Sequence, residues 1–317
     1  MQIEKDIRDS FFSGIYKVMK EDQNSVILTA DHGAFYLTKI SHDFSDRYIN
    51  VGISEQNMVN VASGLALNGK SVYIYSINNF MILRALEQIN INLCAMNLNV
   101  NIVGTGAGFT YSTDGFTHHG LQDMAISMRL PNMQIYNSSD RINTYYMATE
   151  ISIKPGPKYF RIEKGVLDDI YTTESELNDG FGVFNIDKNT KSVIISSGYM
   201  SHNSKKIAES LSSTNHKIGF IDIFKVKPIN FSLINKVIKN IKNIIVIEEN
   251  FYSGSLGELI ALKLQNKPDT RFLHIAVAEN IDFYYGNRDQ LLKRHNLDIN
   301  SLNQKVSIFL GILKFPR

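Results

Sequence analysis

Short apolar runs with the length of buried strands alternate with amphipathic stretches from one end of this chain to the other. In the first half, Ser25–Ala30 and Ser71–Tyr75 are expected strands, and Asn57–Leu67 between them has the apolar spacing of a helix. The second half repeats the order, with expected strands at Ser192–Ser196 and Ile218–Ile223. This alternation is typical of mostly parallel sheets flanked by helices. The sequence therefore predicts an α/β fold.

The length of the chain indicates two such domains. Its 317 residues are enough for two units of roughly 150 residues each, and the hydrophobic fraction of 44% is sufficient for two packed cores. A polar, acidic and glycine-containing stretch without sustained periodicity separates the two halves of the pattern. We therefore expect a first domain over residues 1–170, a linker over 171–190 and a second domain over 191–317.

Charge and composition exclude several classes of protein. The formal net charge of +2 gives no electrostatic reason to expect a nucleic acid or a membrane surface as partner. No apolar run approaches the roughly 20 residues of a membrane span, and Met1–Lys20 lacks the pattern of a signal peptide. The single cysteine, Cys94, lies in an apolar run and is expected to be a buried hydrophobic residue. These features predict a cytoplasmic protein.

Two clusters of polar residues follow expected strands. The first, Tyr111–Asp123, has the position at which open parallel sheets bind ligands. Its adjacent histidines, His118 and His119, diverge in direction and no nearby carboxylate completes a set of ligands, so we expect no metal site in this chain. The second cluster, Tyr48–Asn57, contains Glu55. From spacing alone, Glu55 is interpreted as a carboxylate favoured by the dipole of a helix N-terminus.

Both clusters resemble a known family. The stretches VGISEQNMVNVASGLALNGK (residues 51–70) and DGFTHHGLQDMAISMRLPNMQIYNSSD (residues 114–140) resemble the pyrimidine-binding domain of transketolases and 1-deoxyxylulose-5-phosphate synthases. In the second half, the EEN of Glu248–Asn250, the GSLGE of Gly254–Glu258 and the YGNRDQLL of Tyr285–Leu292 are similar to the C-terminal domain of the same enzymes. The resemblance extends over nearly the whole chain.

The resemblance implies thiamine diphosphate as cofactor and transfer of a two-carbon ketol unit between sugars. Glu55 matches the glutamate that binds the cofactor's aminopyrimidine ring, which favours a catalytic role over the helix-start interpretation. Asp114 and His118 match residues that contact the bound ketose, where a histidine can donate or accept a proton. Asp31 matches an aspartate near the cofactor, with a turn-forming aspartate before Gly33 as the alternative.

The chain departs from the family where the cofactor ring is expected to stack. When the sequence is aligned on Arg84–Ile89, the stacking positions fall on Asn78 and Met81, and Phe80 is displaced by one residue. Phe80 and Met81 are therefore both candidates for the contact with the pyrimidine ring.

The residues that bind the sugar phosphate in transketolases are also altered. Phe35, Gly106 and Lys164 stand at positions where the family carries a serine, a histidine and an arginine. Lys164 and Arg161 remain the expected substrate contacts. The losses suggest a substrate that does not present a terminal phosphate in the usual way, such as a modified or nucleotide-linked sugar.

The sequence lacks the G-D-G…N segment with which the family's N-terminal domain binds a divalent metal and the cofactor diphosphate. Its Asp-Gly pairs, Asp114–Gly115 and Asp179–Gly180, have no such downstream asparagine. The resemblance thus implies the C-terminal subunit of a split enzyme. We expect a separate N-terminal subunit to bind Mg²⁺ or another divalent ion and to share the cofactor, with this chain as the dimer core of an α2β2 heterotetramer that is inactive without the partner.

Two other functions remain open. A synthase of the deoxyxylulose-phosphate type would decarboxylate pyruvate and condense the fragment with an aldehyde, so release of carbon dioxide would distinguish it from ketol transfer. A non-catalytic scaffold that only binds a partner is the alternative from a different class, and the presence of Glu55, Asp114 and His118 argues against it.

Overall fold

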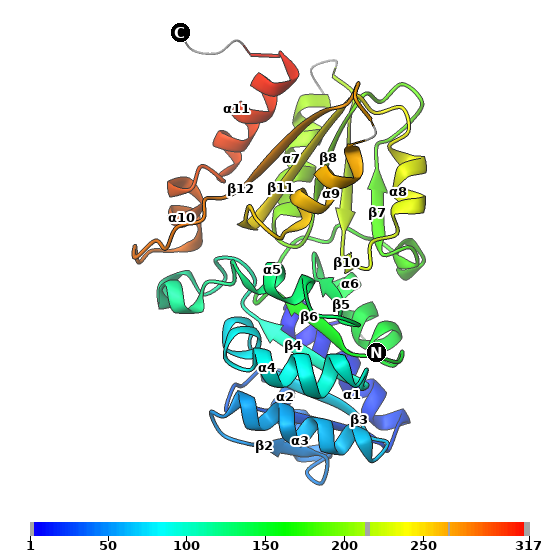
Figure 1. Ribbon diagram of the computed structural model, residues 1–317, viewed down its shortest axis with the longest axis vertical. Helices are drawn as coiled ribbons and strands as arrows, with labels where there is room; N and C mark the ends of the chain where they lie inside the picture. The colour runs from blue at the N-terminus through cyan, green and yellow to red at the C-terminus, as the bar shows by residue number, and fades with distance from the viewer. Residues whose placement is uncertain (1–2, 213–215, 266, 314–317) are drawn as a thin grey trace.

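The computed structural model of the protein describes residues 3–212, 216–265 and 267–313 (Figure 1). Within these residues the strands form two separate sheets, each mostly parallel and each flanked by helices. The predicted α/β fold with two mostly parallel sheets is thereby confirmed. No helix in these ranges is both long and apolar enough to cross a membrane.

The first sheet is built mainly from the first half of the chain. Its strands, in order across the sheet, are β10 (Lys225–Lys227), β5 (Gln134–Asn137), β6 (Lys158–Ile162), β4 (Val100–Thr105), β3 (Ser71–Ile77), β1 (Ser25–Thr29) and β2 (Tyr48–Asn50). The central strands are buried along most of their length because helices cover both faces, which explains their continuous apolar runs.

Helices pack on both faces of the first sheet. On one face lie α1 (Ile7–Glu21), α2 (Phe35–Asp43), α6 (Arg141–Tyr146) and the π-helical turn η5 (Met147–Ile151). On the other lie α3 (Glu55–Leu67), the segment η1–α4–η2 (Phe80–Arg84, Leu86–Gln88, Ile89–Ala95) and α5 (Asp123–Met128). The loop before α5 contains short 3-10 turns, η3 (Ser112–Asp114) and η4 (Phe116–His118).

The second sheet is built from the second half of the chain. Its strands, in order, are β12 (Arg271–Val277), β11 (Asn243–Phe251), β8 (Ser192–Ser196), β9 (Ile218–Ile223) and β7 (Phe181–Phe184). Apolar residues of α7 (Met200–Ser212), α10 (Arg288–Arg294) and α11 (Ile299–Leu310) cover one face, and those of α8 (Phe231–Val237) and α9 (Leu256–Leu264) cover the other.

The edge strands β7 and β10 are features that the sequence pattern did not predict. β7 lies inside the expected linker 171–190, after the short turn η6 (Glu174–Leu177), and pairs antiparallel with β9. β10 follows the start of the second half, yet it pairs antiparallel with β5 of the first sheet. Both strands are short and stand at sheet edges, so they lack the long apolar run that identifies a central strand. β10 connects the second half directly to the first sheet.

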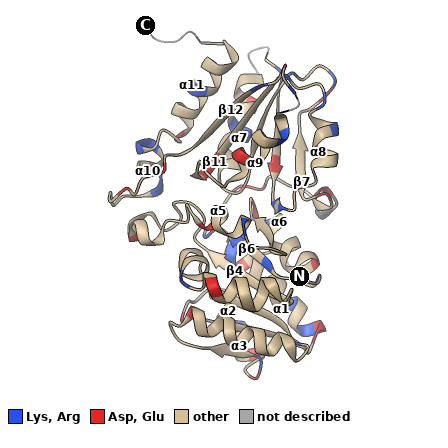
Figure 2. Ribbon diagram, viewed as in Figure 1, with Lys and Arg blue, Asp and Glu red and all other residues tan. Residues whose placement is uncertain are grey.

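A buried ionic cluster also joins the two domains. Arg288 donates to Glu163 of the first domain (Nη1–Oε2, 2.9 Å) and to Glu249 of the second (Nη2–Oε2, 2.5 Å). Its guanidinium carbon lies 3.5 Å from the centre of the Tyr199 ring. Charged residues of both signs meet at this junction around β6 (Figure 2). The cluster therefore holds the carboxyl ends of both sheets together.

Candidate functional site

Glu55 is the first residue of α3 and is almost completely buried, with 1% of its surface exposed. Its Oε1 accepts a hydrogen bond from Ser76 Oγ at 3.1 Å, and its Oε2 accepts one from Arg84 Nη1 at 2.6 Å. These two donors satisfy both oxygens of the buried side chain. Three neighbouring elements, α3, β3 and η1, thus converge on one carboxylate.

The structure separates the two candidates for the cofactor ring contact. Met81 is fully buried in the core between the sheet and α3. Phe80 is half-buried, with its ring 4.7 Å from the guanidinium carbon of Arg84 and 4.9 Å from the His118 ring. Both stand in the π-helical turn η1, whose extra residue rotates the side chains relative to an α-helix. Phe80 is therefore the residue that faces the surroundings of Glu55 and His118.

Asp114 and His118 lie on the loop between β4 and α5. Asp114 is exposed and His118 is half-buried, whereas His119 is 5% exposed and points into the protein, where burial lowers its pKa. Gly115 between them has a φ of 81°, and a β-carbon there would lie 2.7 Å from the Tyr285 ring. Glycine therefore allows this loop to pack against the second domain.

Asp31 occupies a turn at the carboxyl end of β1. Its backbone is in the left-handed region with a φ of 53°, and its carboxylate accepts a hydrogen bond from Asn50 Nδ2 at 3.1 Å. The side chain is exposed. Asp31 therefore forms a turn, as the alternative interpretation expected. Its exposed carboxylate leaves the predicted contact with the cofactor open.

Lys164 is exposed next to a group of residues that the sequence did not single out. Its Nζ lies 5.4 Å from the centre of the Tyr111 ring, and the Tyr111 hydroxyl lies 3.2 Å from His32 Nε2. Burial, together with the positive charges of Arg8, Lys164 and His118, lowers the pKa of His32 to about 4. The sequence could have indicated His32 as a site residue, because it directly follows Asp31. It could not have indicated Arg8, because Arg8 lies on α1, far from Asp31 in the chain.

Arg161 does not have the position expected of a substrate contact. It is 3% exposed, and its guanidinium donates to Asp123 Oδ2 (2.8 Å), Gly120 O (2.5 Å) and Asn250 Oδ1 (2.8 Å). Tyr159 donates to the same Asp123 oxygen at 2.6 Å. Because these partners occupy the guanidinium inside the protein, the substrate-binding prediction for Arg161 is corrected to a role in holding the loop before α5 on the sheet.

Metal-binding side chains do not gather in this site. In the parts of the chain that the structure describes, no three His, Cys, Asp or Glu residues are placed to hold a metal ion together.

Comparison with known proteins identifies the class to which this fold and this carboxylate site belong. Residues 4–168 match the transketolase pyrimidine binding domain, and residues 183–302 match the transketolase C-terminal domain. The class is that of the thiamine diphosphate-dependent transferases. Within it, the chain belongs to the transketolase family and corresponds to its C-terminal half.

Two relatives have nearly the same length as this chain. It is 29% identical over 306 residues to a putative transketolase C-terminal section of Methanocaldococcus jannaschii, covering 95% of each chain. It is 27% identical over 294 residues to one of the subunits of an apulose-4-phosphate transketolase of Phocaeicola vulgatus, covering 92% of this chain and 93% of the relative.

Solved structures share the fold. A split gene transketolase, solved as an inactive beta4 tetramer, superposes with a TM-score of 0.84 at 24% identity, covering 96% of this chain and 98% of the other. The transketolase from Leishmania mexicana superposes with a TM-score of 0.80 at 15% identity, covering 98% of this chain but 46% of the longer one. The chain thus has the fold of roughly half of a full-length transketolase.

Proposed function

We propose that this chain is the pyrimidine-binding subunit of a split transketolase-like enzyme that transfers a two-carbon ketol unit between sugars. The observation that carries the proposal is the buried carboxylate of Glu55, held by Ser76 and Arg84 beside the Phe80 ring. Asp114 and His118 on the adjacent loop are the proposed substrate contacts, together with Lys164.

The residues around Glu55 fit the aminopyrimidine ring of thiamine diphosphate. A buried carboxylate supplies an acceptor for a ring N–H, and the half-buried Phe80 supplies an aromatic surface. The Arg84 side chain is 42% exposed, so it can leave the carboxylate without disturbing the core. Glu55 and Phe80 would hold the ring, and the exposed Asp31 at the carboxyl end of β1 is a further candidate contact.

When bound, thiamine diphosphate supplies the carbanion that attacks a ketose carbonyl. Glu55 would hold the ring nitrogen by a hydrogen bond and would favour the imino form of the aminopyrimidine. The imidazole of His118, which packs edge-on against Phe80, would donate a proton to the substrate oxygen or accept one from it. Asp114 accepts hydrogen bonds from substrate hydroxyls and thereby orients the sugar.

The partner is part of the proposal. The relatives of matching length are named as a C-terminal section and as one of the subunits of transketolases, which supports a second chain. Because this sequence lacks the metal and diphosphate motif, we assign Mg²⁺ or another divalent ion and the diphosphate to an N-terminal transketolase-like subunit. The cofactor would then be shared between subunits of an α2β2 assembly. A pyruvate-decarboxylating synthase is the second candidate, since related synthases also match this chain.

The test compares Glu55→Gln with the wild type, each co-expressed with the candidate N-terminal subunit and assayed for ketol transfer. We expect turnover to fall by about 10³-fold, because the amide cannot carry the charge that favours the imino tautomer. Glu87→Gln, an exposed carboxylate on α4, is the matched control and should keep full activity. Wild-type turnover in Glu55→Gln would contradict the assignment, and release of carbon dioxide from pyruvate would favour the synthase.

The shared cofactor site has its own test. Calorimetry should detect weak thiamine diphosphate binding by this chain alone and much tighter, magnesium-dependent binding by the two-chain complex. Tight magnesium-dependent binding by the isolated chain would contradict the split site.

A further inference from the structure

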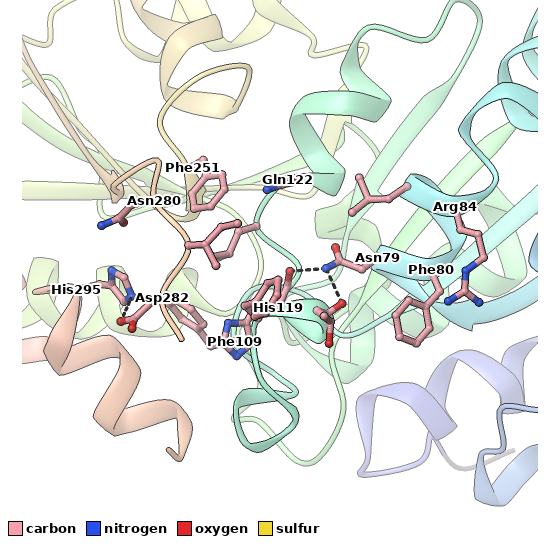
Figure 3. Close-up of a pocket in the computed structure, with 15 residues that line it drawn as sticks. Asn79, Phe80, Arg84, Phe109, His119, Gln122, Phe251, Asn280, Asp282 and His295 are labelled. Atoms are coloured by element: carbon pink, nitrogen blue, oxygen red, sulfur yellow. Dashed lines mark hydrogen bonds and ion pairs between the residues drawn. The ribbon is translucent and has the colours of Figure 1, made fainter. Parts of the chain in front are cut away.

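A cavity of about 470 Å³ lies between the two domains (Figure 3). The first domain contributes Asn79, the turn η1 and the loop before α5, and the second contributes Phe251, the segment Asn280–Asp282 and His295. Its size is within the range of small-molecule sites, which occur preferentially at domain interfaces. Arg84 and Phe80 line the cavity and also contact Glu55 and His118, so the cavity borders the proposed catalytic residues.

Aromatic rings form the walls. The Phe109 ring is packed between two imidazoles, with His295 stacked at 5.2 Å and His119 edge-on at 5.1 Å. The Phe116 ring is supported by the edge of Phe283 at 4.9 Å. Phe109 is fully buried, so its ring supports the wall from behind, and the half-buried Phe116 provides the preformed apolar surface that a ligand can reach.

A buried side-chain amide also lines the same cavity. Asn79 is 6% exposed, and its Nδ2 donates to the carbonyls of Thr117 (3.1 Å) and His119 (2.7 Å). Figure 3 shows the amide nitrogen turned toward these carbonyls and the oxygen on the opposite side. In the part of the chain that the structure describes, Oδ1 has no hydrogen-bond partner. Because Oδ1 has almost no solvent-accessible surface, it does not face the open space of the cavity, and Asn79 contributes by holding the Thr117 and His119 carbonyls in place.

The charges around the cavity do not favour an anion. Among the described residues that line the cavity, Arg84 is the one arginine or lysine, and it forms an ion pair with Glu55. Burial lowers the pKa of both His119 and His295, so these imidazoles are neutral at neutral pH. Burial raises the pKa of Asp282, but the hydrogen bonds from Arg294 and from the Tyr284 backbone, together with the charge of Arg294, lower that pKa overall, so Asp282 is a carboxylate. A phosphate would meet this carboxylate without a free cation to compensate.

We propose that the cavity binds an uncharged sugar ring, the part of the substrate that extends beyond its reacting carbons. Sugar rings have an apolar C–H face that suits the half-buried Phe116 ring and a rim of hydroxyls that can donate to the Asp282 carboxylate. The exposed residues Gln122 and Asn280, which also line the cavity, each add a side-chain amide with a hydrogen-bond donor and an acceptor. This substrate assignment rests on the proposed function, whereas the binding of the ring itself does not.

The test uses the full chain, alone and in complex with its N-terminal partner, and methyl β-D-glucopyranoside as the neutral probe. Saturation-transfer NMR should detect binding at millimolar concentrations, and glucose 6-phosphate should bind about tenfold more weakly. Phe116→Ala and Gln122→Ala should each weaken glucoside binding, the former by about tenfold through loss of a ring face. Tyr252→Ala, an exposed ring outside the cavity, is the control. Thermal melting verifies that each variant is folded.

Two outcomes would overturn the proposal: no glucoside binding by the folded wild-type chain or complex, or equal binding by the Phe116 and Gln122 variants. Preference for glucose 6-phosphate would likewise contradict a neutral ligand. Glu55→Gln should keep its glucoside affinity, so failure of the ketol-transfer proposal would be seen as lost chemistry with intact binding. The two proposals can therefore fail independently.

Discussion

Arg84 Nη1 lies 2.6 Å from Oε2 of Glu55, a carboxylate that is 1% exposed, while the arginine side chain itself is 42% exposed. The pair thus joins a buried charge to a solvent-accessible one. A buried carboxylate is stable only when its oxygens are hydrogen-bonded, and Ser76 serves the other oxygen. The protein therefore pairs the buried Glu55 carboxyl group with a side chain that can be displaced.

Arg84→Met should lower the free energy of unfolding by about 1–3 kcal/mol, because Glu55 would keep only its bond to Ser76. Urea unfolding of this variant and of the same change in a Glu55→Gln background completes a double-mutant cycle. We expect the loss to be smaller in the second background, since a neutral amide needs the guanidinium less. Equal losses of unfolding free energy in both backgrounds would show that the ion pair between Arg84 and Glu55 contributes no coupling energy.

Arg161 and Lys164 should respond differently to the same change. Arg161→Met leaves Asp123 buried without its cation and should cost about 3–5 kcal/mol of unfolding free energy. Lys164 is exposed, so Lys164→Met should change the free energy of unfolding by less than about 0.5 kcal/mol. In the two-chain enzyme, Lys164→Met should instead raise KM for the sugar. Chemical unfolding and steady-state kinetics measure both effects, and an Arg161→Met variant of wild-type stability would contradict the buried role.

Arg288→Met should weaken the junction between the domains. It would leave Glu163 and Glu249, which are 1% and 5% exposed, facing each other without a shared cation. We expect the free energy of unfolding to fall by several kcal/mol. In calorimetry, the single unfolding transition should separate into two, one for each domain. Arg294→Met, which removes a more exposed cation from the same helix, is the control and should cost about 1 kcal/mol or less. A single, unshifted transition in Arg288→Met would exclude this role.

His32 should make stability depend on pH. Its pKa of about 4 in the folded protein lies below its ordinary value of 6.5, so the unfolded chain binds the proton more readily. Its contribution is therefore complete above pH ~6.5 and is lost as the pH falls toward ~4, amounting to about 3 kcal/mol. Urea unfolding of His32→Gln should show a shallower loss of stability than the wild type in this window. Parallel curves would contradict the buried, neutral imidazole.

The sequence predicted most of the central strands and helices, because a buried strand or helix face produces a regular spacing of apolar residues along the chain. The predicted strands Ser192–Ser196 and Ile218–Ile223 coincide with β8 and β9. The edge strands β7 and β10 escaped prediction, since half-exposed residues at a sheet edge carry no continuous apolar run. The π-helical turns η1 and η2 were not visible in apolar spacing either.

By itself, the sequence determined the α/β fold, the family, and the placement of Glu55 at the start of a helix, because these depend on short-range periodicity and contiguous motifs. Tertiary structure alone decided which side chains meet. It buried Arg161 against Asp123, turned Phe80 rather than Met81 outward, and brought Arg8 near His32 and Lys164. Such contacts join residues far apart in the chain, and only the packing of helices on the sheets fixes their distances and their exposure to water.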